Sequence, residues 1–142
     1  MVTPSIYKTE TKEFRQLWIE FIHDLQNRIC AALEEIDGNA KFIQEEWQRA
    51  EGRGGGGITR VIANGNVFEK GGVNTSVVYG KVTPKMRKSL QLDGAKWFAC
   101  GLSLVLHPVN PHAPTVHMNY RYFEIVNPDG TQTAWFGGGT GI

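Results

Sequence analysis

Residues Gly101–Glu124, GLSLVLHPVNPHAPTVHMNYRYFE, form two arms of alternating apolar and polar side chains joined by a proline-rich segment. An alternation of period two places one set of side chains on each face of a β-sheet. The two arms therefore predict two antiparallel strands that pair as neighbours. Each strand keeps one apolar face for a core and one face for polar groups.

The polar face of this predicted hairpin has an unusual composition. It combines a hydroxyl, two imidazoles, an amide and a guanidinium, from Ser103, His107, His117, Asn119 and Arg121. An ordinary solvent-exposed face would more often carry Lys, Glu and Thr. Because guanidinium and imidazole groups donate hydrogen bonds to anions, this face predicts a site for an anionic ligand.

A purely structural interpretation of the same side chains is also open. An arginine between apolar neighbours needs a partner, and a protein carboxylate such as Glu69 or Glu124 would serve as well as a ligand. A histidine within a strand is more often a hydrogen-bonded structural residue than a site residue. Two histidines alone are a weak metal signal, because stable sites usually use three or more protein ligands.

The composition predicts one globular domain that spans residues 1–142. The chain is 41% hydrophobic and 20% charged, and its net charge of +1 argues against a nucleic-acid-binding protein. The sequence contains neither an apolar run of membrane-spanning length nor an apolar N-terminal segment like that of a signal peptide. Two cysteines cannot define a disulfide framework, so we expect a reducing, cytoplasmic setting.

A long amphipathic helix is predicted from about Thr11 to Asp37. Its apolar side chains recur at the three- and four-residue spacing of one stripe: Phe14, Leu17, Trp18, Phe21, Ile22, Leu25, Ile29, Leu33 and Ile36. Asp37-Gly38 is a typical helix stop. A helix of this length, about 37 Å, favours packing across a broad sheet. The next segment, Lys41–Trp47, is compatible with a short helix or a strand.

Glycine clusters punctuate the centre of the chain. Glu51–Gly57 lacks the Lys-Ser/Thr of a phosphate-binding loop and is interpreted as a mobile or tightly packed loop. Asn64-Gly65 predicts a hairpin between Ile58–Ala63 and Asn66–Glu69. Gly71-Gly72 is expected to break the chain before a strand at Val73–Val82.

The C-terminal half predicts further antiparallel strands. Pro84 suits the first position of a short helix, and strands are expected at Trp97–Leu106 and Thr115–Val126. Asn127–Gly130 predicts a tight turn, after which Thr131–Phe136 returns before a final glycine run. One or two helices followed by five or six hairpin-linked strands indicate an α+β fold, an antiparallel meander covered by the long N-terminal helix.

Three blocks of sequence resemble the oxygen-dependent coproporphyrinogen III oxidase family: GRGGGGITRVIANGNVFEKGGVN, HPVNPHAPTVHMNYRYFE and WFGGG. Their order and spacing also match, from about Phe14 onward. The resemblance implies oxidative decarboxylation of two coproporphyrinogen III propionates to vinyl groups, which gives protoporphyrinogen IX in haem biosynthesis. It also implies a flat antiparallel sheet and a homodimer. Molecular oxygen is the co-substrate, and no cofactor is required.

Residue roles follow from the same resemblance. It implies that His117 is the proton donor and that the substrate contacts are Ser103, Asn119, Tyr120 and Arg121. His107 and His117 are positions to which a divalent metal is sometimes assigned, although a metal requirement is doubtful. The segment Val61–Lys70 would contribute to the dimer interface through Val61, Ile62, Val67, Phe68, Glu69 and Lys70.

The resemblance also has departures. Family members are longer, and after the WFGGG block they carry an aspartate where this chain has Gly141. The chain is therefore expected to correspond to the N-terminal half of the enzyme and to show no turnover alone. The alternative to an enzymatic function is a non-catalytic fragment that binds tetrapyrroles or dimerises.

Overall fold

One long helix packs against one face of a six-stranded antiparallel sheet in the computed structural model, which describes residues 11–50, 54–90, 94 and 96–142. The strand order in the sheet is the order in the chain, so every connection joins neighbours. The predicted α+β meander is thus confirmed. The strands are β1 (Ile43–Gln48), β2 (Gly54–Ala63), β3 (Phe68–Lys81), β4 (Lys96–Pro108), β5 (Val116–Val126) and β6 (Gln132–Gly141).

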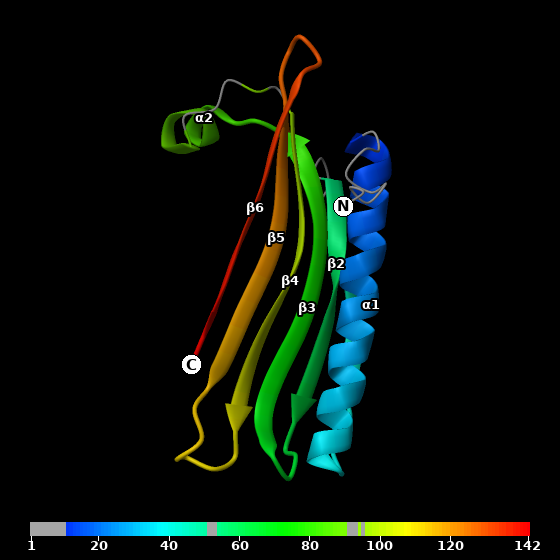
Figure 1. Ribbon diagram of the computed structural model, residues 1–142, viewed down its shortest axis with the longest axis vertical. Helices are drawn as coiled ribbons and strands as arrows, with labels where there is room; N and C mark the ends of the chain where they lie inside the picture. Colours follow the sequence, from blue (N-terminus) through cyan, green and yellow to red (C-terminus); the bar gives the residue numbers. More distant parts are fainter. Residues whose placement is uncertain (1–10, 51–53, 91–93, 95) are drawn as a thin grey trace, which may run out of the picture.

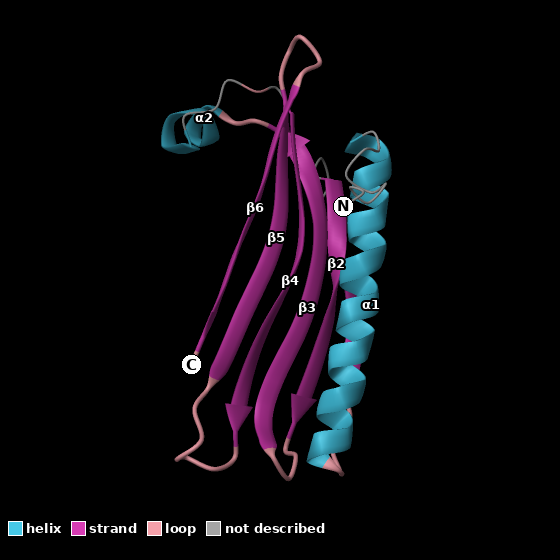
Figure 2. Cartoon of the chain, in the orientation of Figure 1, coloured by secondary structure: helices cyan, strands magenta, loops and turns pink. Residues whose placement is uncertain are grey.

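The predicted helix is confirmed as α1 (Thr11–Asp37), which runs along one face of the sheet (Figure 1). It ends at Gly38, whose φ of 76° is the left-handed conformation that glycine adopts without strain. In Figure 2, α2 (Pro84–Leu90) stands away from the sheet near the upper part of the strands, on the side opposite α1, and no helix of the described chain runs along that face. The sheet therefore has one covered face and one open face.

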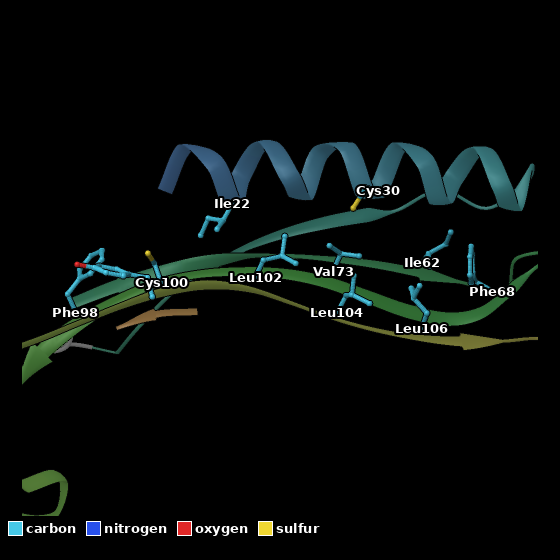
Figure 3. Close-up of a cluster of buried hydrophobic side chains, with 11 residues drawn as sticks. Ile22, Cys30, Ile62, Phe68, Val73, Phe98, Cys100, Leu102, Leu104 and Leu106 are labelled. Carbon is cyan, nitrogen blue, oxygen red and sulfur yellow. The ribbon is translucent and has the colours of Figure 1, made fainter. Parts of the chain in front are cut away.

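The core lies between α1 and the sheet. Side chains from the helix and from β2, β3 and β4 meet there, among them Ile22, Val73 and Leu102, each at most 1% exposed (Figure 3). The alternation in β4 is as predicted, because Leu102, Leu104 and Leu106 are all buried while Ser103 is exposed. This burial fixes which face of the hairpin points away from the helix.

Gln26 is a polar anchor within this core that apolar periodicity does not predict. Its side-chain nitrogen donates to the carbonyls of Ile58 and Val73, both at 2.9 Å. Its oxygen accepts the hydroxyl of Thr75 at 3.3 Å. Both polar ends of the buried amide are therefore satisfied, which removes most of the cost of its burial.

Arg15 and Glu124 form a second anchor between the helix and the sheet. The Arg15 guanidinium makes two hydrogen bonds to the Glu124 carboxylate, one of them at 3.0 Å, and lies over the Phe98 ring. The Tyr122 hydroxyl donates to the same carboxylate at 2.8 Å. Glu124 is thus not the partner of Arg121. The two residues are three positions apart in β5, an odd number, so their side chains point to opposite faces of the strand.

Asp37 joins the end of the helix to the β2–β3 turn. Its carboxylate accepts the backbone N–H groups of Phe68, Ala40, Val67 and Asn66 at 2.9–3.1 Å. These donors, led by Phe68, stabilise the ionised form and hold the pKa of Asp37 well below its usual range. The Asn64-Gly65 turn predicted from sequence is confirmed, with Asn64 at a φ of 55°.

We expect Asp37→Asn to lower the denaturation midpoint at pH 7, because an amide cannot accept all four N–H groups. The pKa of Asp37 is depressed in the folded state. Its contribution is therefore present above the unfolded pKa of about 3.9 and is lost as the pH falls below it. The variant should accordingly lose less stability than the parent between pH 5 and pH 2.

The matched control is Asp129→Asn, which alters an exposed turn carboxylate that accepts only from Thr131. Urea melts at several pH values would compare the three proteins. If both variants lowered the midpoint equally, the proposed role of Asp37 would be wrong.

Three expectations about glycine are wrong. Gly54–Gly57 begins β2 instead of forming a loop, although Glu51–Arg53 lie outside the described residues. Gly71-Gly72 continues β3, with only a register shift between Phe68 and Lys70. The last strand continues beyond Phe136 to Gly141. The ambiguous segment at Lys41–Trp47 supplies a strand, β1.

Close approach explains the first of these errors. A Cβ atom on Gly57 would lie only 2.5 Å from an indole carbon of Trp47 and closer still to the Thr75 carbonyl. Glycine at this position lets the indole lie over the neighbouring strand. These glycines therefore clear space within the sheet instead of turning the chain.

Candidate functional site

The strand register brings most of the predicted polar residues together on the open face. Ser103 pairs with Asn119, Gly101 with Arg121 and Val105 with His117 across β4 and β5. Residues opposite each other in a sheet share a face. The predicted pairing of the hairpin arms is confirmed.

A hollow of about 590 Å³ extends over this open face. A polar row crosses its middle, because Thr59 pairs with Asn74, Asn74 with Ser103, and Ser103 with Asn119. Trp47 closes the hollow at the β1 side, and Arg121 lies at the β5 side. The described face thus offers hydroxyls, amides and one guanidinium above a sheet floor.

Arg121 is exposed and has no carboxylate within 4 Å among the described residues. Its direct cross-strand neighbours are Gly101 on β4 and Gly137 on β6. Neither neighbour has a side chain that could cover or pair with the guanidinium. The arginine is therefore free to bind an anion from solution.

The glycine run of β6 opens the same face further. Gly139 is opposite Asn119, and Gly141 is opposite His117. A Cβ atom on Gly139 would meet nothing within 4 Å, whereas one on Gly141 would lie 2.6 Å from the His117 ring. The run thus leaves room for a ligand beside Asn119 and lets the imidazole lie over the backbone.

The two histidines do not complete a metal site. His107 lies one step beyond the Val105–His117 pair, and its Nδ1 is 3.4 Å from the Thr115 hydroxyl. The described residues contain no group of three His, Cys, Asp or Glu side chains placed to hold a metal ion. Two imidazoles are fewer ligands than a stable site usually uses. The described residues therefore do not by themselves form a metal site.

Comparison of the sequence with known proteins places this chain in a family. The family model for coproporphyrinogen III oxidase matches residues 18–142. The chain belongs to the coproporphyrinogen III oxidase family. Oxygen-dependent coproporphyrinogen-III oxidase of Prochlorococcus marinus subsp. pastoris is 48% identical over 137 residues, 95% of this chain and 38% of that protein. The enzyme of Prochlorococcus marinus strain MIT 9515 is 52% identical over 120 residues, 83% of this chain and 33% of that protein.

The chain thus spans about two fifths or less of the length of these coproporphyrinogen oxidases. In the part of the chain that the structure describes, no helix is both long and apolar enough to cross a membrane.

Tyr120 does not join the other residues that the coproporphyrinogen oxidase resemblance implicates in substrate binding. It pairs with Leu102 and Gly138 and so lies on the helix side of the sheet. There it lines a separate hollow of about 410 Å³ with Phe136 and residues 137–140. Sequence neighbours in a strand point to opposite faces, which separates Tyr120 from both Asn119 and Arg121.

The six residues assigned to a dimer interface divide into two groups. Ile62 and Phe68 are buried in the core of this chain. Val61 is partly buried, and the other three are exposed: Val67, Glu69 and Lys70. The surface of this hairpin is therefore formed by Val67, Glu69 and Lys70, with a partial contribution from Val61.

The sequence predicted only Ser103, Asn119 and Arg121 among the residues that line the hollow. Asn74 and Trp47 line it from β3 and β1. The alternation within Val73–Val82 is a signal that could have placed Asn74 and Ser76 on one face. No sequence signal gave the pairing of β3 with β4, which brings Asn74 beside Ser103.

Proposed function

We propose that this chain supplies part of the substrate face of an oxygen-dependent coproporphyrinogen III oxidase. The substrate would lie on the open face of the sheet, with one propionate paired to Arg121. The observation that carries the proposal is an exposed guanidinium between two glycines, beside a hollow lined by polar groups. Membership of the family supports the choice of coproporphyrinogen III as the ligand.

The chemistry of the ligand suits this face. Coproporphyrinogen III carries four propionates, and a guanidinium binds a carboxylate through two parallel hydrogen bonds. Asn119 is one same-face step from Arg121, about 7 Å along β5, and Ser103 lies opposite Asn119 on β4; both provide further donors. The broad sheet supports the macrocycle between these groups.

His117 is proposed as a proton donor. Each decarboxylation breaks the bond to CO₂, removes a hydride equivalent from the neighbouring carbon and leaves a vinyl group. Transfer of those two electrons to O₂ consumes one proton and gives hydrogen peroxide. An imidazole can supply such a proton near neutral pH. His117 lies exposed on the same face as Asn119 and Arg121.

We also propose a homodimer in the cytoplasm, as the resemblance implies. The exposed Val67, Glu69 and Lys70 would take part in the subunit contact. Cys30 and Cys100 are free and buried, and burial raises the pKa of both thiols, that of Cys100 to about 12. Unreactive, unpaired thiols are in keeping with a reducing compartment.

The test is binding by Arg121→Ala. The loss of a charge-assisted bidentate contact is expected to weaken binding of coproporphyrinogen III about 10- to 100-fold. Titration under anaerobic conditions, followed by tryptophan fluorescence, measures the dissociation constant. Lys88→Ala, which removes an exposed cation on α2, is the control and should bind like the parent. Equal affinities of the two variants would contradict the assignment of a propionate to Arg121.

A second candidate function is tetrapyrrole binding without turnover. It is favoured by Gly141, which faces His117 at the position where the resemblance implies an aspartate. Incubation with coproporphyrinogen III in air separates the two candidates. Protoporphyrin fluorescence after oxidation of the product would support the enzyme, whereas binding without product would support the second candidate.

A further inference from the structure

Asn74 lines the hollow, and the oxygen of its side-chain amide is a buried hydrogen-bond acceptor that is not used within the protein. Among the described residues, its Oδ1 is the one buried side-chain polar atom without a hydrogen-bond partner. It lies in the polar row between Thr59 and Ser103, yet neither hydroxyl bonds to it. A buried acceptor without a partner is costly, so Oδ1 would gain from a donor on a ligand that occupies the hollow next to Asn74.

The position of Asn74 relative to Arg121 limits what that donor can be. Asn74 on β3 and Arg121 on β5 are two strands and one same-face step apart, about 12 Å between Cα atoms. A ligand whose carboxylate binds Arg121 therefore extends its body toward Asn74. In coproporphyrinogen the inner part of the macrocycle carries four pyrrole N–H groups, and these are donors.

We propose that Asn74 is a substrate-positioning residue whose Oδ1 accepts a hydrogen bond from a pyrrole N–H. This inference rests on the proposed binding of coproporphyrinogen III to the open face. The terminal torsion of an asparagine is broad, so rotation of the amide group would turn the buried Oδ1 toward the hollow when a donor is bound there. Arg121 then recognises the periphery of the ligand, and Asn74 recognises its reduced centre.

The pairing also provides a basis for selectivity between redox states. Coproporphyrin, the oxidised macrocycle, is planar, and its two remaining N–H groups point within the ring plane toward two imine nitrogens. They are therefore not directed at an acceptor on the face of the ring, whereas the pyrroles of the porphyrinogen can tilt their N–H groups toward one. A hydrogen bond to Asn74 therefore favours binding of the porphyrinogen, whereas Arg121 binds the same propionates in both compounds. The two residues are expected to respond differently to the two ligands.

The test is Asn74→Leu, with Asn74→Ala as a second variant that avoids the larger side chain. Dissociation constants for coproporphyrinogen III, under anaerobic conditions, and for coproporphyrin III are measured for the parent, both variants and Arg121→Ala. We expect the Asn74 variants to bind coproporphyrinogen about 3- to 10-fold more weakly and coproporphyrin almost unchanged. Arg121→Ala should weaken both ligands.

The urea midpoint distinguishes a substrate-positioning role of Asn74 from a structural one. If Asn74 had only a structural role, its replacement would lower the midpoint. Since Oδ1 has no partner in the free protein, its removal should leave the urea midpoint unchanged or raise it. If the parent and the Asn74 variants bind coproporphyrinogen with equal affinity, the role of Asn74 is overturned while the proposed function stands. A parent that does not bind the porphyrinogen would overturn it together with the proposed function. A lowered midpoint with unchanged selectivity would assign Asn74 a structural role instead.

Discussion

Arg15→Met is expected to lower the free energy of unfolding by about 3–5 kcal/mol, since it leaves a buried carboxylate without its counter-ion. The Glu124 side chain is 0% exposed, and its remaining donor is the Tyr122 hydroxyl. Methionine keeps much of the packing of the arginine stem over Phe98, so most of the loss reflects the charge. Urea denaturation followed by circular dichroism measures the change.

Two further variants isolate this effect. Arg28→Met removes an exposed ion pair with Asp24 on the same helix and should cost no more than about 0.5 kcal/mol. Replacing Glu124 by Leu and Tyr122 by Phe in the Arg15→Met background should recover most of the lost stability, because no buried polar group then lacks a partner. An Arg15→Met protein as stable as Arg28→Met would show that the pair does not anchor the helix.

Leu102→Ala is expected to cost about 2–5 kcal/mol, as is usual for a buried leucine. Leu102 is 1% exposed beneath α1, at the centre of the core. Val105 lies on the same strand but on the open face and is 42% exposed. Val105→Ala should therefore change the stability by no more than about 1 kcal/mol.

The comparison tests which face of β4 the helix covers. Both variants shorten an apolar side chain within one strand. Valine is the better strand former, so the loss of strand propensity adds to the cost of Val105→Ala and acts against the expected difference. Thermal and urea melts of the two proteins give the free-energy differences. A Val105→Ala variant as unstable as Leu102→Ala would mean that the open face is covered by another part of the protein.

Local patterns predicted much of the fold because burial imposes them directly. The alternation in Gly101–Glu124 gave the two faces of β4 and β5, and their register brought Ser103, Asn119 and Arg121 together as expected. Asp37-Gly38 marked the end of α1, and Asn64-Gly65 marked the turn between β2 and β3. Each of these signals arises within a few residues of chain.

The glycine clusters were misinterpreted because their role depends on neighbours distant in sequence. Gly57 is needed where Trp47 crosses it, and Gly137 leaves space next to Arg121. Glycine has the same sequence signature in a turn as in a crowded strand. Only the pairing of the strands distinguishes the two cases.

The polar anchors of the core were missed for a similar reason. Glu124 was a candidate partner for Arg121, but its actual partner, Arg15, is 109 residues away in the chain. Tyr120 shows the limit of transferring a role to a whole run of residues, since its side chain lies on the opposite face from Arg121. A motif gives residue types, whereas the pleat of the strand decides which of them share a site.

The most direct test of the proposed ligand face uses two tryptophan indole N–H signals in a ¹H–¹⁵N spectrum recorded during anaerobic addition of coproporphyrinogen III. Trp47 lines the hollow on the open face, whereas the Trp18 indole bonds to the Cys100 carbonyl on the helix side. We predict that the Trp47 signal shifts with the Asn119 side-chain amide and the Arg121 Nε–H, while the Trp18 signal stays in place. A shift of Trp18 without a shift of Trp47 would contradict binding at the open face and would move the site to the hollow around Tyr120 and Phe136.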